Sequence, residues 1–327
     1  MTIFHRLPFL RGLAAVSTLI VLAGCQIHQT IPAASWTHDQ FTAPDGASFS
    51  YSKWLPDGNP RAVILALHGL GGAASDWRPL GDYLQKRGLA VYAHELRGMG
   101  NDPKPGRMGH LDRREGWCED FVSFALRVQA THPEVPIFWY GESLGGIIGT
   151  HLLEDARHHG LRPRGFILAS PIVRVSGKLP IWKEWALWLG ARVAPRFRLR
   201  LQSLAPSDQP PAQVVSTTTH DAQLAQTPHA VTHFSLRMLD QIRRLVAENR
   251  LLVKNNSHPI LVLYAGHDVF TPPGEVEDFF GEIGGIHNEK IYFPQAYHLL
   301  LHDIGSLVIL GEIEKWLENN LKKEMTF

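Results

Sequence analysis

An apolar run at residues 136–140 is followed directly by the segment Gly-Glu-Ser-Leu-Gly-Gly at residues 141–146. Residues 147–153 then show the pattern of a helix, so a serine lies between two glycines at a strand-to-helix turn. Such a turn is tight, and only residues without side-chain bulk at positions 141 and 145 let Ser143 project its hydroxyl above the edge of the sheet. The sequence therefore predicts Ser143 as a catalytic nucleophile.

Short apolar segments with the composition of strands alternate along the chain with segments of helical periodicity. They lie at 48–54, 62–67, 89–96, 135–140, 165–170, 260–265 and 289–293. This alternation predicts an α/β fold, in which a mostly parallel central sheet carries helices on both faces. About 90 residues separate the strands at 165–170 and 260–265, which is too long for a plain crossover. We therefore expect a helical cap insertion at about residues 172–255.

A serine hydroxyl becomes a strong nucleophile only with a base beside it and a carboxylate behind that base. Asp268 follows the predicted strand at 260–265, and His298 lies in the loop after the strand at 289–293. Both lie at carboxyl ends of parallel strands, where the active sites of such sheets gather. The chain order Ser143, Asp268, His298 is the order expected of a triad on such a sheet. The competing candidates are His267, His302 and Asp303.

Catalysis by such a triad also requires two backbone N–H groups that bind the developing oxyanion. One of them belongs to Leu144, directly after the nucleophile. The second is expected from Leu70, in the segment His-Gly-Leu-Gly-Gly at residues 68–72 that follows the strand at 62–67. The alternative interpretation of these glycines is a tight strand-to-helix turn without a catalytic role.

Four spaced motifs have counterparts in one known family: HGLGG at 68–72, HELRGMG at 94–100, GESLGG at 141–146, and the pair AGHD and AYH around Asp268 and His298. On these motifs the chain resembles the monoacylglycerol lipase and lysophospholipase branch of the α/β-hydrolases, which is related to serine aminopeptidase-like hydrolases. The resemblance extends over about residues 40–320. It implies an enzyme that cleaves the carboxylic ester of a single-chain lipid through an acyl-enzyme intermediate. A carboxylesterase, an aminopeptidase-like hydrolase of other substrates and a non-catalytic surface lipoprotein remain open.

Two residues depart from the pattern of that branch. Glu142 precedes the nucleophile where the branch more often has histidine, and Glu95 replaces the commoner aspartate of the second motif. Glu142 either shapes the leaving-group side of the site or hydrogen-bonds within the elbow. Since the nucleophile is a serine, the sequence argues against the epoxide hydrolase and dehalogenase branches, whose intermediate is an ester of a carboxylate.

The predicted cap contains a tryptophan-rich helix at residues 179–189, with Trp182, Trp185 and Trp188 on or near one face. This face either covers an acyl-chain pocket, enters a lipid interface or packs on the core. Four arginines follow the helix and form either a site for an anionic head group or a solvated surface: Arg192, Arg196, Arg198 and Arg200.

The first 25 residues have the features of a secretory signal. A basic start precedes an apolar stretch at residues 12–23, which is shorter than the roughly 20 residues needed to span a bilayer. The ending Leu-Ala-Gly-Cys at 22–25 resembles a bacterial lipobox. That resemblance implies that residues 1–24 are removed and that Cys25 carries the lipid that anchors the protein to a membrane.

This interpretation places the protein in the bacterial cell envelope, with Gln26 favouring the outer membrane. The polar, turn-rich residues 25–43 are expected to form a tether, and residues 44–327 the hydrolase domain with its cap. An ordinary secretion signal with a chance cysteine is the alternative.

The charge balance excludes several other classes of protein. With 32 basic and 31 acidic residues the formal net charge is +1, which provides no basic field for nucleic acid. No spacing of His or Cys matches a zinc site, so we expect neither a metal nor a cofactor. The expected partners are therefore a lipid or small ester substrate and a membrane, and the sequence does not indicate an oligomeric state.

Overall fold

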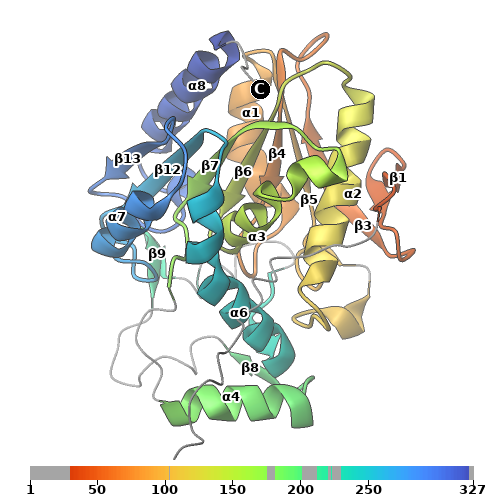
Figure 1. Cartoon of the computed structure of the whole chain (residues 1–327), viewed down its shortest axis with the longest axis vertical. Coiled ribbons are helices and arrows are strands. Elements are labelled where there is room, and N and C mark those ends of the chain that lie inside the picture. The colour runs from red at the N-terminus through yellow and green to blue at the C-terminus, as the bar shows by residue number, and fades with distance from the viewer. Residues whose placement is uncertain are drawn as a thin grey trace, which may run out of the picture.

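The structure, a computed structural model, describes residues 30–102, 104–174, 181–200, 212–219, 222 and 230–323. The predicted signal peptide, with Cys25, lies outside these residues. Within them nine strands form one sheet (Figure 1), in the order β1 (Ser35–Trp36), β2 (Gln40–Thr42), β3 (Ser48–Trp54), β5 (Leu89–His94), β4 (Ala62–Leu67), β6 (Ile137–Glu142), β7 (Pro163–Ala169), β12 (Ile260–Ala265) and β13 (Glu289–Phe293).

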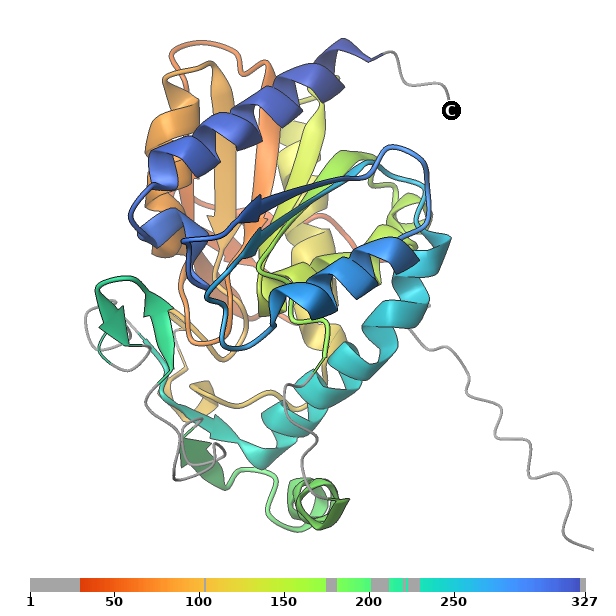
Figure 2. The ribbon, with the colours of Figure 1, turned by 90° about the vertical axis from the view of Figure 1, so that its left-hand side faces the viewer.

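The six strands from β5 to β13 pair in parallel, and β1, β2 and β3 add an antiparallel edge. The predicted α/β fold is therefore confirmed. Parallel pairing brings the carboxyl ends of these strands to one edge of the sheet, which Figure 2 shows facing the segments inserted between β7 and β12. Every side chain that follows one of these strands is thus delivered to a common edge.

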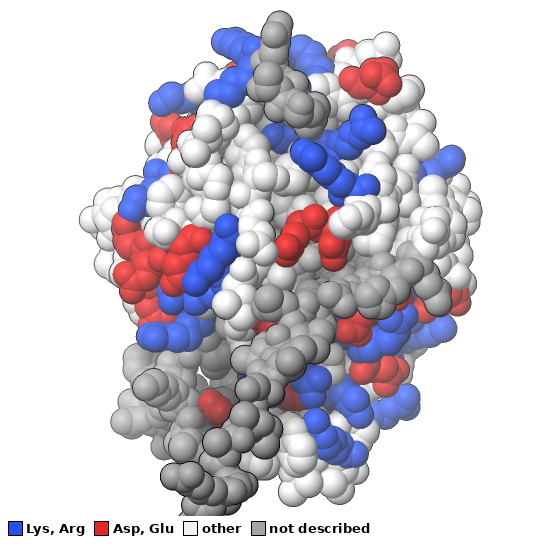
Figure 3. Space-filling model, viewed as in Figure 1, with Lys and Arg blue, Asp and Glu red and all other residues white. Residues whose placement is uncertain are grey.

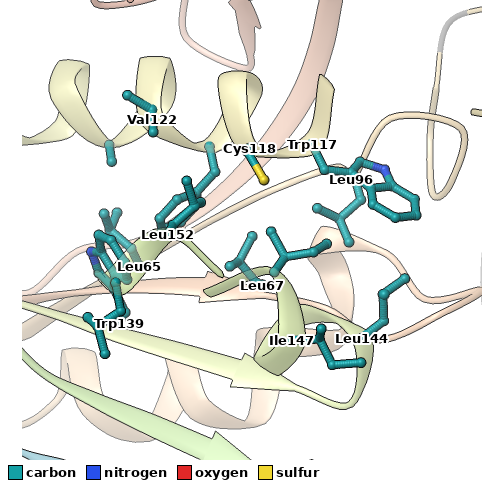
Figure 4. Packing of buried hydrophobic residues seen from close by; sticks show 14 of the residues in the cluster. Leu65, Leu67, Leu96, Trp117, Cys118, Val122, Trp139, Leu144, Ile147 and Leu152 are labelled. Carbon is teal, nitrogen blue, oxygen red and sulfur yellow. The ribbon is translucent and has the colours of Figure 1, made fainter. Parts of the chain in front are cut away.

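The core lies on both faces of the sheet, because every residue of β4 is buried and alternate residues point to opposite sides. Leu65 and Leu67 pack on the side of α2 (Glu115–Thr131) and α3 (Leu144–Leu153), as Figure 4 shows. The opposite side is covered by α1 (Arg78–Gln85) and α8 (Ser306–Lys322). Burial of each leucine side chain contributes about 2 kcal/mol, so the continuous apolar runs that predicted strands also hold the layers together.

The folded body begins earlier than the sequence predicts. Part of the expected tether forms β1 and β2, and Phe41 of β2 is fully buried with its ring 5.4 Å from that of Phe49. Ile31 and Ala34 are buried in the same cluster. Residues 31–43 are therefore part of the domain, because their few apolar side chains complete the core beside β3.

The segment between β7 and β12 contains α4 (Ile181–Val193), the strand pairs β8 (Arg198–Arg200) with β11 (His233–Ser235) and β9 (Gln213–Val215) with β10 (Thr218–Thr219), and α6 (Leu236–Leu252). Figures 1 and 2 show α6 running from the body of the protein out to α4. The side chain of Ser235 caps α6 by accepting a hydrogen bond from Met238 N at 3.1 Å. The backbone of β9 is tied to the loop after β13, where Leu299 N donates to Val214 O at 2.9 Å.

On the face drawn in Figure 3, acidic and basic side chains are interspersed over most of the surface. Among the helices of the described ranges, none combines the length and apolarity that crossing a bilayer requires.

Candidate active site

Ser143 occupies the turn between β6 and α3 with a left-handed backbone, at φ 53° and ψ −116°. A residue with a side chain pays about 1–3 kcal/mol to hold such a conformation, and this strain is characteristic of a nucleophile elbow. The strained peptide is fixed by a hydrogen bond from Ser143 N to Ala169 O of 3.0 Å, at the end of the neighbouring strand β7. The side chain remains only slightly accessible, at 8%.

The two glycines beside the elbow are required by close backbone contacts. A Cβ atom on Gly145 would lie 2.1 Å from the carbonyl oxygen of Leu67, at the end of β4. A Cβ atom on Gly141 would lie 2.5 Å from the Cα atom of Gly146. Both contacts are far below any permitted separation, so the spacing of the motif follows from the packing of α3 against β4 and β6.

His298 and Asp268 come together at the same edge of the sheet. The Nδ1 atom of His298 lies 2.8 Å from Oδ2 of Asp268, and both side chains are buried. The other carboxylate oxygen, Oδ1, accepts the backbone N–H groups of Phe270 at 2.8 Å and Thr271 at 3.1 Å. With Nδ1 engaged, the Nε2 atom of His298 is the nitrogen left for the serine, as a general base requires.

The loop that carries His298 is held close to the elbow. Ser170, which follows the Ala169 bound by Ser143 N, donates its hydroxyl to His298 O at 2.6 Å. Among the described residues no hydrogen bond joins the Ser143 and His298 side chains. In free enzymes this bond is commonly long and tightens only when substrate binds.

The electrostatics favour a histidine that accepts a proton. Burial opposes the charged imidazole, but the charge and hydrogen bond of Asp268, together with the charge of Glu142, outweigh it and raise the pKa of His298 above its ordinary value. A raised pKa makes His298 a stronger base. The same negative charges stabilise the imidazolium that forms during attack by Ser143.

The predicted oxyanion donors, Leu70 and Leu144, flank the nucleophile. Leu144 is the first residue of α3, so its N–H has no partner within the helix. The loop of Leu70 touches the elbow, since a Cβ atom on Gly69 would lie 3.3 Å from the Cβ of Ser143. The loop of Leu70 and the first turn of α3 therefore both lie beside Ser143, and the roles of the two N–H groups as oxyanion donors stay predictions.

His68 supports this loop, a role that the sequence did not assign to it. Its Nδ1 bonds Gly69 O at 2.8 Å and its Nε2 accepts the N–H of Leu96 at 3.0 Å. This pattern requires a neutral ring, and burial accordingly lowers the pKa of His68. The sequence contains a signal for this supporting role, because His68 is the first residue of the HGLGG motif.

Glu95, the second departure from the family pattern, is part of the same support. Its Oε2 accepts the N–H of Ala74 at 2.9 Å, and a Cβ atom on Gly100 would lie 1.8 Å from that oxygen. Burial raises the pKa of Glu95 to about 7. The longer acidic side chain is therefore accommodated by a glycine that leaves room for it.

The competing candidates have other contacts. The ring of His267 stacks on Tyr297 with centroids 5.0 Å apart. Asp303 accepts hydrogen bonds from the N–H and hydroxyl of Ser216 and from the N–H of Tyr297, which fastens the β9 hairpin to the His298 loop. His302 is exposed, and its charge acts on Glu142.

The predicted cap tryptophans are not brought to the triad. Trp182 and Trp185 are 67% and 63% exposed on the outer face of α4, and Trp188 is 38% exposed. The inner face of α4 packs on α6, where a Cβ atom on Gly190 would lie 2.7 Å from Leu236 Cδ1. In the part of the chain that the structure describes, the tryptophan face is therefore turned away from the core.

The four predicted arginines do not gather at one place: Arg192 lies within α4, and Arg198 and Arg200 lie in β8. The guanidinium of Arg192 stacks over Trp188 at 3.8 Å, and Arg198 donates to the backbone of Gly106 and Met108.

Across the described ranges, no three His, Cys, Asp or Glu residues gather in a group suited to a metal ion.

The chain is similar to known hydrolases over most of its length. Residues 58–305 match the family described as serine aminopeptidase, S33. The monoacylglycerol lipase of Mycolicibacterium smegmatis is 26% identical over 287 residues, which cover 86% of this chain and 96% of that protein. The monoglyceride lipase of Mus musculus is 28% identical over 284 residues, with coverage of 85% and 89%.

The fold is shared with solved structures. A soluble variant of the monoglyceride lipase of Saccharomyces cerevisiae, in complex with a substrate analog, has a TM-score of 0.71 at 19% identity and covers 91% of this chain and 98% of its own. The monoacylglycerol lipase of Paleococcus ferrophilus has a TM-score of 0.68 at 21% identity, with coverage of 83% and 99%.

Proposed function

Because this chain belongs to the serine aminopeptidase S33 family, we propose that it hydrolyses the carboxylic ester of a single-chain lipid, a monoacylglycerol or a lysophospholipid. The observation that carries the proposal is the strained Ser143 at the edge of the sheet that also holds the His298–Asp268 pair at 2.8 Å. The names of the relatives support a lipid substrate, since two lipases match it over at least 85% of its length.

In the proposed mechanism each group has its own step. Ser143 Oγ attacks the ester carbonyl while His298 Nε2 takes its proton, and Asp268 holds the ring and stabilises its positive charge. The N–H groups of Leu70 and Leu144 bind the oxyanion. His298 then gives the proton to the leaving alcohol, and the same residue activates the water that hydrolyses the acyl-enzyme.

A substrate panel tests this proposal. Release of fatty acid or amine is measured from monoacylglycerols, lysophospholipids, triacylglycerols and aminoacyl amides, with the protein of residues 26–327 and with its Ser143→Ala variant as the blank. Turnover of single-chain lipids that disappears in the variant supports the proposal. Hydrolysis of aminoacyl amides without any ester would favour the second candidate, an aminopeptidase-like activity, to which the family description itself points.

We also propose that the outer face of α4 contacts the surface of a lipid aggregate. The exposed apolar residues recur at helical spacing along one stripe: Trp182, Trp185, Leu189 and Val193, each at least 54% exposed. Large exposed apolar stripes of this kind mark interaction surfaces, and tryptophan prefers the boundary between lipid and water. Lys183 and Arg192 beside the stripe fit anionic head groups.

Replacing Trp185 with alanine is expected to lower activity on micellar esters about tenfold and to leave activity on monomeric, water-soluble esters unchanged. The reason is that the exposed ring contributes free energy only when lipid covers it. Initial rates are compared below and above the critical micelle concentration of one substrate. Ile286→Ala, an exposed apolar residue outside α4, is the control. An equal loss on both forms of substrate would refute interfacial contact.

We further propose that Cys25 carries a lipid that holds the protein on the outer membrane of the bacterial envelope. The proposal is supported by the sequence Leu-Ala-Gly-Cys at 22–25. Replacing Cys25 with serine is expected to move the protein from the membrane fraction to the soluble fraction. Mass spectrometry of the wild type should show an acylated N-terminal cysteine. A membrane-bound Cys25→Ser variant, or a Cys25 found in a disulfide with Cys118, would contradict the anchor.

A further inference from the structure

The side chain of Glu142 has a position that the triad mechanism leaves unexplained. Alternate residues of β6 point to the same face of the sheet. On one face Phe138 contacts Trp316, with ring centroids 5.8 Å apart, and Tyr140 contacts Trp77 at 4.6 Å. Glu142 is the next residue on that face and the last of the strand. It therefore points to the side of α1 and α8, directly beneath the oxyanion loop.

The side chain of Glu142 is largely buried, and among the described residues it makes no hydrogen bond. The residue is 8% exposed, and the recorded hydrogen bonds of the described residues include none to its side chain. Its Oε1 would lie 3.7 Å from a Cβ atom on Gly69, which shows how closely the oxyanion loop approaches. A carboxylate that is largely removed from water and makes no hydrogen bond is stabilised by positive charge that forms beside it.

Two of the ionisable groups in the described part of the chain whose charges act on Glu142, His298 and His302 after β13, are able to carry positive charge. The others are Tyr140 on its own strand, Asp76 in the 3-10 turn Ala74–Trp77 and Asp268 after β12. The histidine loop packs on the same face, since Leu300 and Leu301 share a buried cluster with Tyr140. Of the two histidines, His298 is the buried one.

We propose that Glu142 is a positioning residue for His298, a second carboxylate that together with Asp268 stabilises the imidazolium formed when Ser143 attacks. The proton moves from Ser143 Oγ to His298 Nε2 and on to the leaving group, and Glu142 takes no part in the transfer. Its contribution is electrostatic, through a site from which water is largely excluded. The inference rests on the serine hydrolase function proposed above.

The acid–base behaviour of the site agrees with this role. Burial raises the pKa of Glu142, and the neighbouring His302 and His298 oppose that rise. Reciprocally, the charge of Glu142 is one of the interactions that raise the pKa of His298. His298 must be neutral to accept the proton, so activity falls as the pH drops below its pKa. Removal of the Glu142 charge lowers that pKa, so the acid limb of the pH profile moves to lower pH.

The test compares Glu142→Gln, which keeps the shape but not the charge, with Glu142→Asp, which keeps the charge. The rate of labelling by a fluorophosphonate probe is followed from about pH 5 to about pH 9, because this reaction needs Ser143 and His298 but no particular substrate. In Glu142→Gln we expect the acid limb to move to lower pH and the plateau rate to fall about five- to tenfold. In Glu142→Asp we expect the acid limb and the plateau rate to stay closer to those of the wild type. Glu154→Gln, an exposed carboxylate in α3's C-terminal flank, is the matched control and should leave the profile unchanged.

The outcomes separate the two proposals. A Glu142→Gln variant with the wild-type acid limb overturns the inference, whether or not its plateau falls, because a merely structural role lowers the rate without moving the limb. Melting temperatures of the variants identify such a loss of structure. A wild-type protein that the probe does not label overturns the serine hydrolase function itself, and the inference with it.

Discussion

Replacing Ser143 with alanine is expected to lower kcat/KM by about 10⁴-fold or more and to leave the fold intact. The hydroxyl forms the bond to the acyl group, and without it His298 has no proton to remove. The residual rate comes from the oxyanion donors and from binding, which remain when the nucleophile is lost. The measurement is fatty-acid release from the substrates of the panel, together with labelling by a fluorophosphonate probe.

Ser257→Ala is the control for this experiment. Ser257 is exposed and lies before β12, at the end of the sheet opposite the elbow. This variant should keep both turnover and labelling. Labelling of the Ser143→Ala protein at the wild-type rate would show that another serine is the nucleophile.

Replacing Gly145 with alanine is expected to destabilise the protein by about 3 kcal/mol or more and to abolish activity. The new Cβ would lie 2.1 Å from Leu67 O, and a backbone atom at the end of a central strand has no room to retreat. Either α3 moves away from β4 or the strand end is displaced. Either movement displaces Ser143 and Leu144 from their positions in the active site. The free energy of unfolding is measured by urea denaturation.

Gly281→Ala tests whether the effect is specific to the elbow. Gly281 lies in α7 (Pro273–Glu282), and a Cβ there meets no atom within 4 Å. Alanine is the better helix former, so this variant should be as stable as the wild type or more stable by up to about 1 kcal/mol. A Gly145→Ala protein of wild-type stability and activity would show that α3 is not packed against β4 as described.

The sheet and the order of the site residues are predictable from the sequence because each depends on local patterns. Strands buried on both faces appear as continuous apolar runs, and the runs at 62–67 and 260–265 coincide with β4 and β12. Residues that follow parallel strands share an edge, so Asp268 and His298 can be placed near each other without knowledge of their contacts.

Other features depend on contacts that no local pattern encodes. β1 and β2 are only two and three residues long, so they show no periodicity, and they are strands because Phe41 and Ile31 fill the core beside β3. The apolar stripe of α4 is visible in the sequence, but its direction is set by the packing of the opposite face on Leu236. The surroundings of Glu142 come from segments more than 60 residues away along the chain, at Asp76 and His298.

The hydrogen bonds between the β9 hairpin and the His298 loop connect the cap to the chemistry. Val214 O accepts a hydrogen bond from Leu299 N at 2.9 Å, and Ser216 donates both its N–H and its hydroxyl to the carboxylate of Asp303. A displacement of the hairpin must stretch these bonds, so the position of the cap and the placing of the general base are thermodynamically linked. Such linkage is reciprocal. A ligand that holds the hairpin in place also holds the base in place, and a ligand that binds the correctly placed base strengthens binding at the hairpin by the same free energy.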